Sequence, residues 1–307
     1  MLFNTVTSTT NRTVRKRSAE QQMRFLQPPQ LDTWIRNHNE VDSFIKEYDI
    51  LVNTEHDSVA INAKESDTLN TSTFEVRPSN VSVSNLMLTV REFDMPKLLT
   101  EKIKHDLSES EDILNIYEKH IGFHPNVKDS RFANCVEIFF ENYQSKKIAI
   151  KVFTDSTCHI TGVKKPHIGI ELAWMMHHII CAMHTNIRRR THVDVKFDNI
   201  HADFSMMLPR NCVMNTIRMR EVINNGILDQ FENADFEFIQ VKPDYRIVSR
   251  NKHEYTGTRI NIMFRMYDDV YQVCVTPFNT GSCLICSKNP EAINKICILM
   301  IKFFSLV

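Results

Sequence analysis

The chain has 307 residues, of which 42% are hydrophobic and 24% are charged, and its mean hydropathy is −0.29. These values predict a soluble globular protein with two small domains or one larger one. The 37 Lys and Arg residues balance the 37 Asp and Glu residues. Attraction of polyanions through overall charge is therefore excluded, and a nucleic-acid partner would have to be met by a local patch.

The cysteines and the two ends of the chain indicate an intracellular protein. The eight cysteines are spread through apolar stretches instead of forming a compact framework. The first residues, MLFNTVTSTTNRTVRKRS, lack the apolar core that a signal peptide needs. We therefore expect free thiols in a reducing compartment. The last stretch, ICILMIKFFSLV, contains Lys302 and is too short to span a bilayer, so it predicts a buried helix and no membrane partner.

Residues 1–75 are predicted to be an N-terminal arm. The first 20 or so are rich in Ser, Thr and Asn, which favours disorder. Their basic run, residues 15–17, fits a nucleic-acid contact, a localisation signal or a solvated tail. Apolar residues at helical spacing predict a helix over 31–52. The polar, turn-rich stretch that follows predicts a linker with a boundary near residue 76.

From residue 76 onward the order of predicted elements is legible and is repeated. The first copy contains a strand, a helix, three strands and a helix, at 76–93, 94–107, 131–142, 146–153, 157–162 and 166–184. The second copy has the same order, at 193–208, 209–223, 258–269, 270–278, 282–286 and 290–304. We therefore expect repeats at 76–190 and 191–307.

The repeat is clearest around one phenylalanine. The segments KVFTDSTCHITG and TPFNTGSCLICS align without a gap and pair Phe153 with Phe278 and Cys158 with Cys283. Two copies predict an α+β fold with one pseudo-twofold antiparallel sheet, helices on one face and an uncovered opposite face. Such a face with a phenylalanine at each corner predicts a partner surface. The alternative is a phenylalanine packed under its own loop.

Strand geometry assigns the remaining positions of this motif to faces. Side chains alternate along a strand, so His159 and Thr161 lie on one side and Cys158 on the other. In the second copy Leu284 and Cys286 share a face.

Residues from about 76 to 307 resemble the TATA-box-binding protein family, most closely the divergent versions carried by large DNA viruses. The family motif reads Phe-x-x-Gly-Lys-x-Val-x-Thr-Gly. Phe153, Thr161 and Gly162 match it in the first copy, and Phe278 and Gly281 match it in the second.

Two further strands carry the resemblance. RFANCVEIFF resembles the Arg-Phe-Ala-Ala strand of the family, which implies that Phe132 is the partner of Phe153. DNIHADFSMMLP resembles the Gln-Asn strand, so Asn199 matches the asparagine that reads minor-groove acceptors. In the first copy Asn80 is the best match, with Asn85 as the alternative.

The resemblance implies a saddle with helices on its convex face and a concave sheet that lies in the minor groove of promoter DNA. Paired phenylalanines would wedge between base steps and kink the duplex. This family is a general example of DNA bending by inserted apolar side chains. His159, Thr161, Leu284 and Cys286 would then face the DNA. The implied partners are a transcription factor B-like protein and RNA polymerase, in a nucleus, a cytoplasmic viral factory or a virion.

Several positions depart from the family motif. The wedge position opposite Phe278 aligns with Arg259 or Tyr255, and arginine there favours a narrow minor groove. The other departures are His159 and Leu284 for valine, Cys286 for threonine, Thr157 and Ser282 for lysine, and an added Asp155. Fewer cations release fewer counterions, so we expect weak or promoter-context-dependent DNA binding. The alternative function is a protein-interaction module with the saddle fold and weak or no DNA binding.

Other residue groups predict little chemistry. Cys283 and Cys286 form a CxxC that suggests zinc or redox chemistry, but a strand directs them to opposite faces. His177, Cys181 and His184 share a helix face without an evident fourth ligand. The basic run at 188–190 fits a solvated connection or a partner contact. With six glycines and no phosphate loop or nucleophile–base arrangement, we expect no cofactor, no metal and no catalysis.

Overall fold

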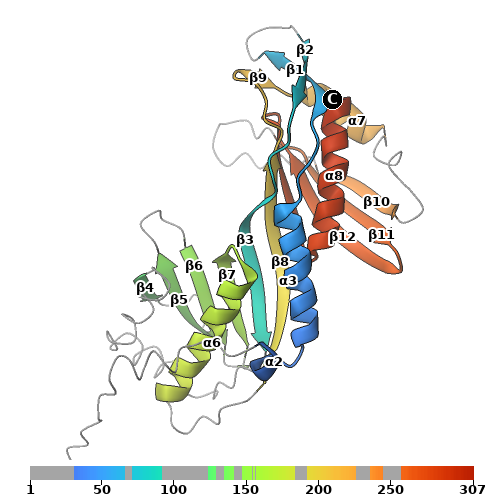
Figure 1. Cartoon of the computed structure of the whole chain (residues 1–307). Helices are drawn as coiled ribbons and strands as arrows, with labels where there is room; N and C mark the ends of the chain where they lie inside the picture. The colour runs from blue at the N-terminus through green and yellow to red at the C-terminus, as the bar shows by residue number, and fades with distance from the viewer. Residues whose placement is uncertain are drawn as a thin grey trace, which may run out of the picture.

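A computed structural model gives the structure of the chain. It describes residues 31–65, 71–91, 124–128, 135–141, 147–153, 155, 157–183, 192–225, 236–244 and 257–307. Within these ranges ten strands form one curved antiparallel sheet, and three other strands form a second sheet beside it (Figure 1). The expected α+β class with a large antiparallel sheet is confirmed.

The ten-stranded sheet has the same strand order on either side of its centre. The first five strands are β3 (Ser82–Arg91), β4 (His124–Lys128), β5 (Cys135–Glu141), β6 (Lys147–Phe153) and β7 (Cys158–Val163). The other five are β8 (Asp194–Ser205), β10 (Phe236–Asp244), β11 (Arg259–Met266), β12 (Asp269–Pro277) and β13 (Ser282–Ser287). Their order is β10-β11-β12-β13-β8-β3-β7-β6-β5-β4. From the centre outward, each half begins with the strand that comes first in the sequence. The last strand in the sequence follows, and then the remaining strands in reverse sequence order.

The two central strands, β3 and β8, are antiparallel and pair around Leu86 and Ile200. On one side of this pair Asn85 lies opposite His201, and on the other side Met87 lies opposite Asn199. Each strand contains an irregularity next to its asparagine, where the register shifts by one residue. An extra residue in a ladder bends the strand locally and increases its twist. Both asparagines are therefore held at bends in the middle of the sheet.

Three helices pack on one face of this sheet: α3 (His38–Asn53), α6 (Pro166–Met183) and α8 (Pro290–Leu306) (Figure 1). The helix α8 begins where the Asn289 side chain accepts a hydrogen bond from the Ala292 backbone, 2.8 Å away. Pro290 follows in the first turn, where its missing N–H costs no helical hydrogen bond. The apolar stripe of α8 is buried from Ile293 to Phe304. The helices expected at both repeat ends are thus confirmed.

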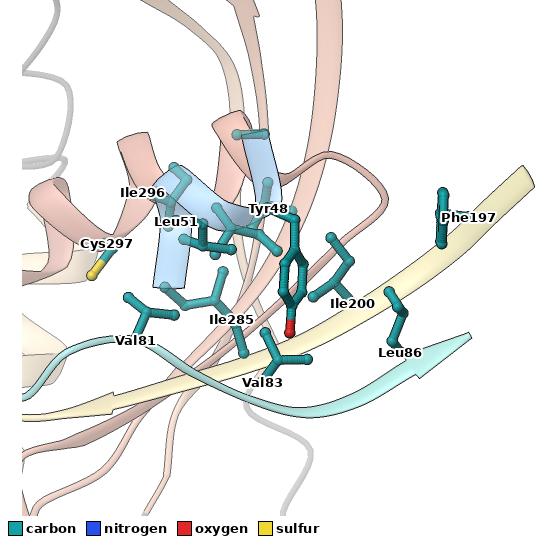
Figure 2. Close-up of a cluster of buried hydrophobic side chains, with 14 of the residues drawn as sticks. Tyr48, Leu51, Val81, Val83, Leu86, Phe197, Ile200, Ile285, Ile296 and Cys297 are labelled. Carbon is teal, nitrogen blue, oxygen red and sulfur yellow. The ribbon is translucent and has the colours of Figure 1, made fainter. Parts of the chain in front are cut away.

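The helix α3 fills the seam between the two halves of the sheet. Its Phe44 ring stacks on Phe197 of β8, with centroids 3.7 Å apart. Its Tyr48 hydroxyl donates to the backbone carbonyl of Lys164, just before α6, and burial together with Asp49 raises the Tyr48 pKa to about 12. Leu51 is completely buried and lies beside α8 and the sheet (Figure 2). The predicted helix at 31–52 is thus part of the main core.

The segment before α3 is tied to the sheet by its backbone. The short helix α2 spans Leu31–Trp34, and Ile35 then forms a parallel bridge with Val193. The Asn37 side chain donates to the Val195 carbonyl at 2.7 Å and accepts from the Val195 amide at 3.0 Å. It therefore pairs with β8 as a neighbouring backbone would. These contacts break the predicted helix into two pieces.

The linker predicted between this helix and residue 76 is wrong. Residues Val59–Glu65 (β1) and Thr71–Val76 (β2) form a hairpin that pairs with β9 (Cys212–Val213). Only one side of the hairpin is apolar, with Ile61 and Ala63 buried, so its polar outer side resembled a loop in sequence. The helix α7 (Thr216–Asn224) follows β9 and is shorter than predicted. The predicted helix at 94–107 lies outside the described residues, and the repeat boundaries stay a prediction.

Candidate nucleic-acid interface

The side of the ten-stranded sheet opposite α3, α6 and α8 is the candidate interface, and we call it the open face. Its residues alternate with the core residues of each strand. On β7 and β13 the buried residues Cys158, Ile160, Cys283 and Ile285 point to the helices. The half-buried residues His159, Thr161, Leu284 and Cys286 alternate with them. The structure therefore places these four predicted site residues together on the open face.

Two hairpin turns present Phe153 and Phe278 in the same way. The Phe153 amide donates to the Thr157 carbonyl at 2.8 Å, and the Phe278 amide donates to the Ser282 carbonyl at 2.8 Å. Each phenylalanine thus closes the strand before the turn, and both are half-buried. The gapless alignment of the two segments is confirmed at this level. The turns lie near the C-terminal ends of β3 and β8, which run in opposite directions, so the rings lie at opposite ends of the sheet.

The Phe153 turn is held by its acidic residue. The Asp155 carboxylate accepts from the Thr157 amide at 3.1 Å and from the Thr157 hydroxyl at 2.6 Å. An aspartate that bonds the backbone two residues ahead stabilises a turn without glycine. The Phe153 ring lies 4.9 Å from the His159 ring, centroid to centroid. Asp155 therefore has a structural role in addition to its charge.

The Phe278 turn uses glycines in place of that aspartate. Gly281 has φ of +81°, and its amide donates to the Phe278 carbonyl at 3.0 Å. Gly257 forms a bridge with Phe278. A Cβ atom on Gly257 would lie 2.7 Å from the Phe278 ring, so only glycine admits the ring at this position. The Phe278 ring therefore packs on the backbone of Gly257, two residues before β11 begins.

The structure places the two candidate asparagines of the first copy, Asn80 and Asn85, at different positions. Asn85 and Asn199 both sit at the register shifts of the central strands, next to the paired Leu86 and Ile200. Asn80 precedes β3 and is exposed. Asn85 thus shares with Asn199 a position beside a bulge and Asn80 does not, and which of the two contacts a partner stays a prediction. Asn85 accepts from the Gly162 amide at 2.7 Å, and the Asn199 amide nitrogen lies 3.0 Å from His201 Nε2.

The register also fixes the position of Arg259 relative to Phe278. Cys135 pairs with Phe153 on one side, and Gly257 pairs with Phe278 on the other. Arg259 lies two residues beyond the residue paired with Phe278, as Glu137 lies two residues beyond the residue paired with Phe153. Its role as a wedge residue stays a prediction. Arg259 is exposed, and its Nε donates to the Cys274 thiol at 3.0 Å. The predicted sites Phe132 and Tyr255 lie outside the described residues.

The charges of the open face are mixed. Glu137 pairs with Lys151 at 3.0 Å, and Glu237 pairs with Arg265 at 2.8 Å. The Glu237–Arg265 pair is exposed and adds little stability, whereas Glu137 is buried beneath its pair with Lys151. In both pairs the opposite charges largely cancel at a distance. The described part of the face is therefore not a strongly cationic surface.

Two carboxylates on β8 were missed by sequence reasoning. Asp198 accepts a hydrogen bond from the Thr89 hydroxyl, and Asp203 accepts one from Ser82 at 2.7 Å. Asp203 lies between the buried Ala202 and Phe204 and so lies on the open face. Asp198 lies in the bulge beside Asn199 and bonds to Thr89, which is opposite His159 of the open face. The alternation of IHADFS indicates the face of Asp203, whereas the break in alternation at Asp198 and Asn199 hides that of Asp198. Carboxylates at the centre of the face oppose an approaching phosphate backbone.

The other residue groups from the sequence are only partly described. His177 is buried, whereas the Cys181 side chain, His184 and the basic runs at 15–17 and 188–190 lie outside the described residues. Cys283 and Cys286 lie on opposite faces of β13, as predicted. Among the described side chains, no three of His, Cys, Asp or Glu are placed to hold a metal ion together. None of the described helices has the length and apolar character needed to cross a membrane.

Comparison with known proteins gives structural matches only. No family model matches the sequence, and no curated protein matches it. Eighteen solved chains match the structure. One of them is the TBP of Methanococcus jannaschii, which is 12% identical and covers 74% of this chain and 98% of its own length, with a TM-score of 0.39.

Proposed function

We propose that the chain is a TATA-box-binding-protein-like transcription initiation factor whose open face binds and bends promoter DNA through the minor groove. In this proposal it recruits a transcription factor B-like protein and RNA polymerase inside the cell, and it acts by binding and not by catalysis. The observation that carries the proposal is the pair of matched hairpins. They hold Phe153 and Phe278 by the same backbone hydrogen bond at opposite ends of one sheet.

We also propose that the two halves are copies related by a pseudo-twofold axis, which makes the sheet a saddle. The identical strand order on either side of β3 and β8 supports this. The register supports it too, because an offset of 114 residues maps Leu86 onto its own partner Ile200 and Asn85 onto Asn199. A twofold axis through the Leu86–Ile200 pair produces this pattern. It places two asparagines near the middle of the groove-binding surface and one phenylalanine at each end.

The arrangement suits minor-groove binding on energetic grounds. Unstacking a base step costs a few kcal/mol. Burying an aromatic ring removes roughly 150–250 Å² from water, which returns about 4–6 kcal/mol before ordering costs at ~25 cal/mol/Å². The energy gained by burying an inserted ring can therefore offset the cost of the kink that the ring makes. Amides in the middle of the face can donate to the acceptors of A·T pairs, which the minor groove displays.

The direct test is a bending measurement with the full chain. A duplex with an AT-rich centre and a fluorophore at each end reports its end-to-end distance by energy transfer. We expect transfer to rise as protein is added, to fall as salt is raised, and to change much less with a GC-rich duplex of equal length. Absence of any change at saturating protein would contradict the proposal. Nanomolar, salt-tolerant binding would contradict only the expected weakness of binding.

The two aspartates favour a second candidate function, a protein-interaction module that keeps the saddle and binds DNA weakly or not at all. Asp198 and Asp203 lie on a central strand of the face. A partner protein with basic residues would complement them, whereas a phosphate backbone would not.

Changing both aspartates to asparagine separates the two functions. Asparagine keeps an acceptor oxygen for Thr89 and Ser82 and removes two negative charges. If the face binds DNA, we expect D198N/D203N to bind the AT-rich duplex roughly tenfold more tightly, about 1.4 kcal/mol. The matched control is D49N/D57N, which removes two exposed charges outside the open face. Equal tightening by both variants would indicate a general charge effect, and no binding by either would favour the protein-interaction module.

A further inference from the structure

A pair of thiols lies on the open face beside Arg259. Cys274 of β12 and Cys286 of β13 are directly opposite each other in the antiparallel register. Both are free and only partly buried. Opposite residues in such a pair have Cα atoms about 4.5–5.5 Å apart. A disulfide needs a Cα separation of roughly 4.4–6.8 Å, so these two sulfurs can be joined without moving the strands.

The surroundings distinguish this pair from the other cysteines. The Arg259 Nε donates to the Cys274 sulfur at 3.0 Å. Partial exposure beside a cationic group is the environment in which cysteines are oxidised. Cys283 and Cys297, by contrast, are buried in the core, and burial raises the pKa of both thiols. The environment of Cys286 lies between these two cases. Burial raises the pKa of its thiol to about 11, and the positive charge of Arg259 opposes that rise.

We propose that Cys274 and Cys286 form a peroxide-sensitive dithiol that closes to an intramolecular disulfide across β12 and β13. The Cys274 thiol loses its proton, its thiolate attacks hydrogen peroxide, and the O–O bond breaks to give a sulfenic acid and hydroxide, which takes up that proton to form water. The Cys286 sulfur then attacks the Cys274 sulfur, the S–O bond breaks, and a second water leaves as the disulfide forms. Two electrons pass from the thiols to peroxide, which is the only co-reactant.

This modification site does not depend on DNA binding, although it alters the face that we propose to contact DNA. The disulfide removes both thiol protons and changes the acceptor that holds Arg259. It therefore alters the second half of the face and leaves the Phe153 half unchanged.

The test is differential alkylation of the folded full chain. The protein is treated with dilute hydrogen peroxide, alkylated, reduced, and alkylated again with an isotopically heavy reagent. Chymotryptic cleavage after Phe278 separates Cys274 from Cys286 for mass spectrometry. We expect both residues to carry the heavy label and to appear, without reduction, as one cross-linked pair lighter by two hydrogens. Cys212 is the matched control, because it is partly exposed and lies opposite Glu65 in the register.

Two variants complete the experiment. In C286S we expect peroxide to leave Cys274 as a trappable sulfenic acid, and in C274S we expect Cys286 to remain alkylated by the first reagent. The proposal is overturned if Cys274 and Cys286 stay as accessible to the first reagent as Cys212 does. It is also overturned if the recovered cross-link joins Cys274 to Cys283.

Discussion

Replacing Phe153 and Phe278 together by alanine is expected to abolish the bend that the wild-type chain imposes on AT-rich DNA. The backbone amide of each phenylalanine closes one hairpin turn at one end of the open face. Alanine keeps that backbone hydrogen bond and removes the side chain that would enter the duplex. If each wedge contributes about 1–2 kcal/mol after the cost of unstacking, the double variant loses roughly 100-fold in affinity. The energy-transfer assay measures both losses.

The single variants give a sharper form of the same prediction. The Phe278 ring rests on the backbone at Gly257, whereas the Phe153 ring lies beside His159. We expect F153A and F278A each to remove the kink at its own end and to leave a smaller bend. The matched control is I217A, which removes an exposed apolar side chain of α7 that is not part of the open face. Bending by the double variant equal to that of I217A would refute the wedge role of both rings.

Leu51→Ala is expected to lower the free energy of unfolding by about 2–5 kcal/mol, because it leaves a cavity in a fully buried site. Leu51 has 0% exposure, and it lies with Ile285 and Ile296 where α3, α8 and the sheet meet (Figure 2). Urea denaturation followed by tryptophan fluorescence measures the change, since Trp34 and Trp174 are both buried. If α3 belongs to the main core, the whole fold loses this stability and unfolds at a lower urea concentration.

The same helix supplies the control for this prediction. Ile50 is the preceding residue and is 61% exposed. Ile50→Ala is expected to change stability by less than about 0.5 kcal/mol. If Leu51→Ala changed stability as little as Ile50→Ala, α3 would be a detachable arm, as the sequence had suggested. A lowered midpoint with unchanged denaturant dependence would confirm that α3 unfolds with the sheet.

The strands with clear alternation were predicted correctly, and the edge strands were not. β7 and β13 alternate buried and partly exposed residues over their whole length, so their faces followed from sequence. β4 has five residues and contains Pro125. β10 contains Pro243 and a register shift at Phe238. Both are the outermost strands of the sheet, where proline is tolerated and apolar alternation is weak.

The amino-acid sequence by itself determined the local features of this protein. Periodicity identified the helices α6 and α8 and most strands, and the gapless alignment of the two hairpins placed Phe153 and Phe278 at equivalent turns. Such features depend on residues a few positions apart, which interact through hydrogen bonds and alternation that a sequence displays directly.

Only the tertiary structure decided the long-range relations. The bulges in β3 and β8 put Asn85 and Asn199 at similar bends. The register placed Arg259 two residues beyond the residue paired with Phe278. Packing against β8 and α8 made α3 part of the core. A one-residue shift in register reverses every side chain, and register is set by which apolar faces can be buried together. That information belongs to the packed sheet and to no single segment of it.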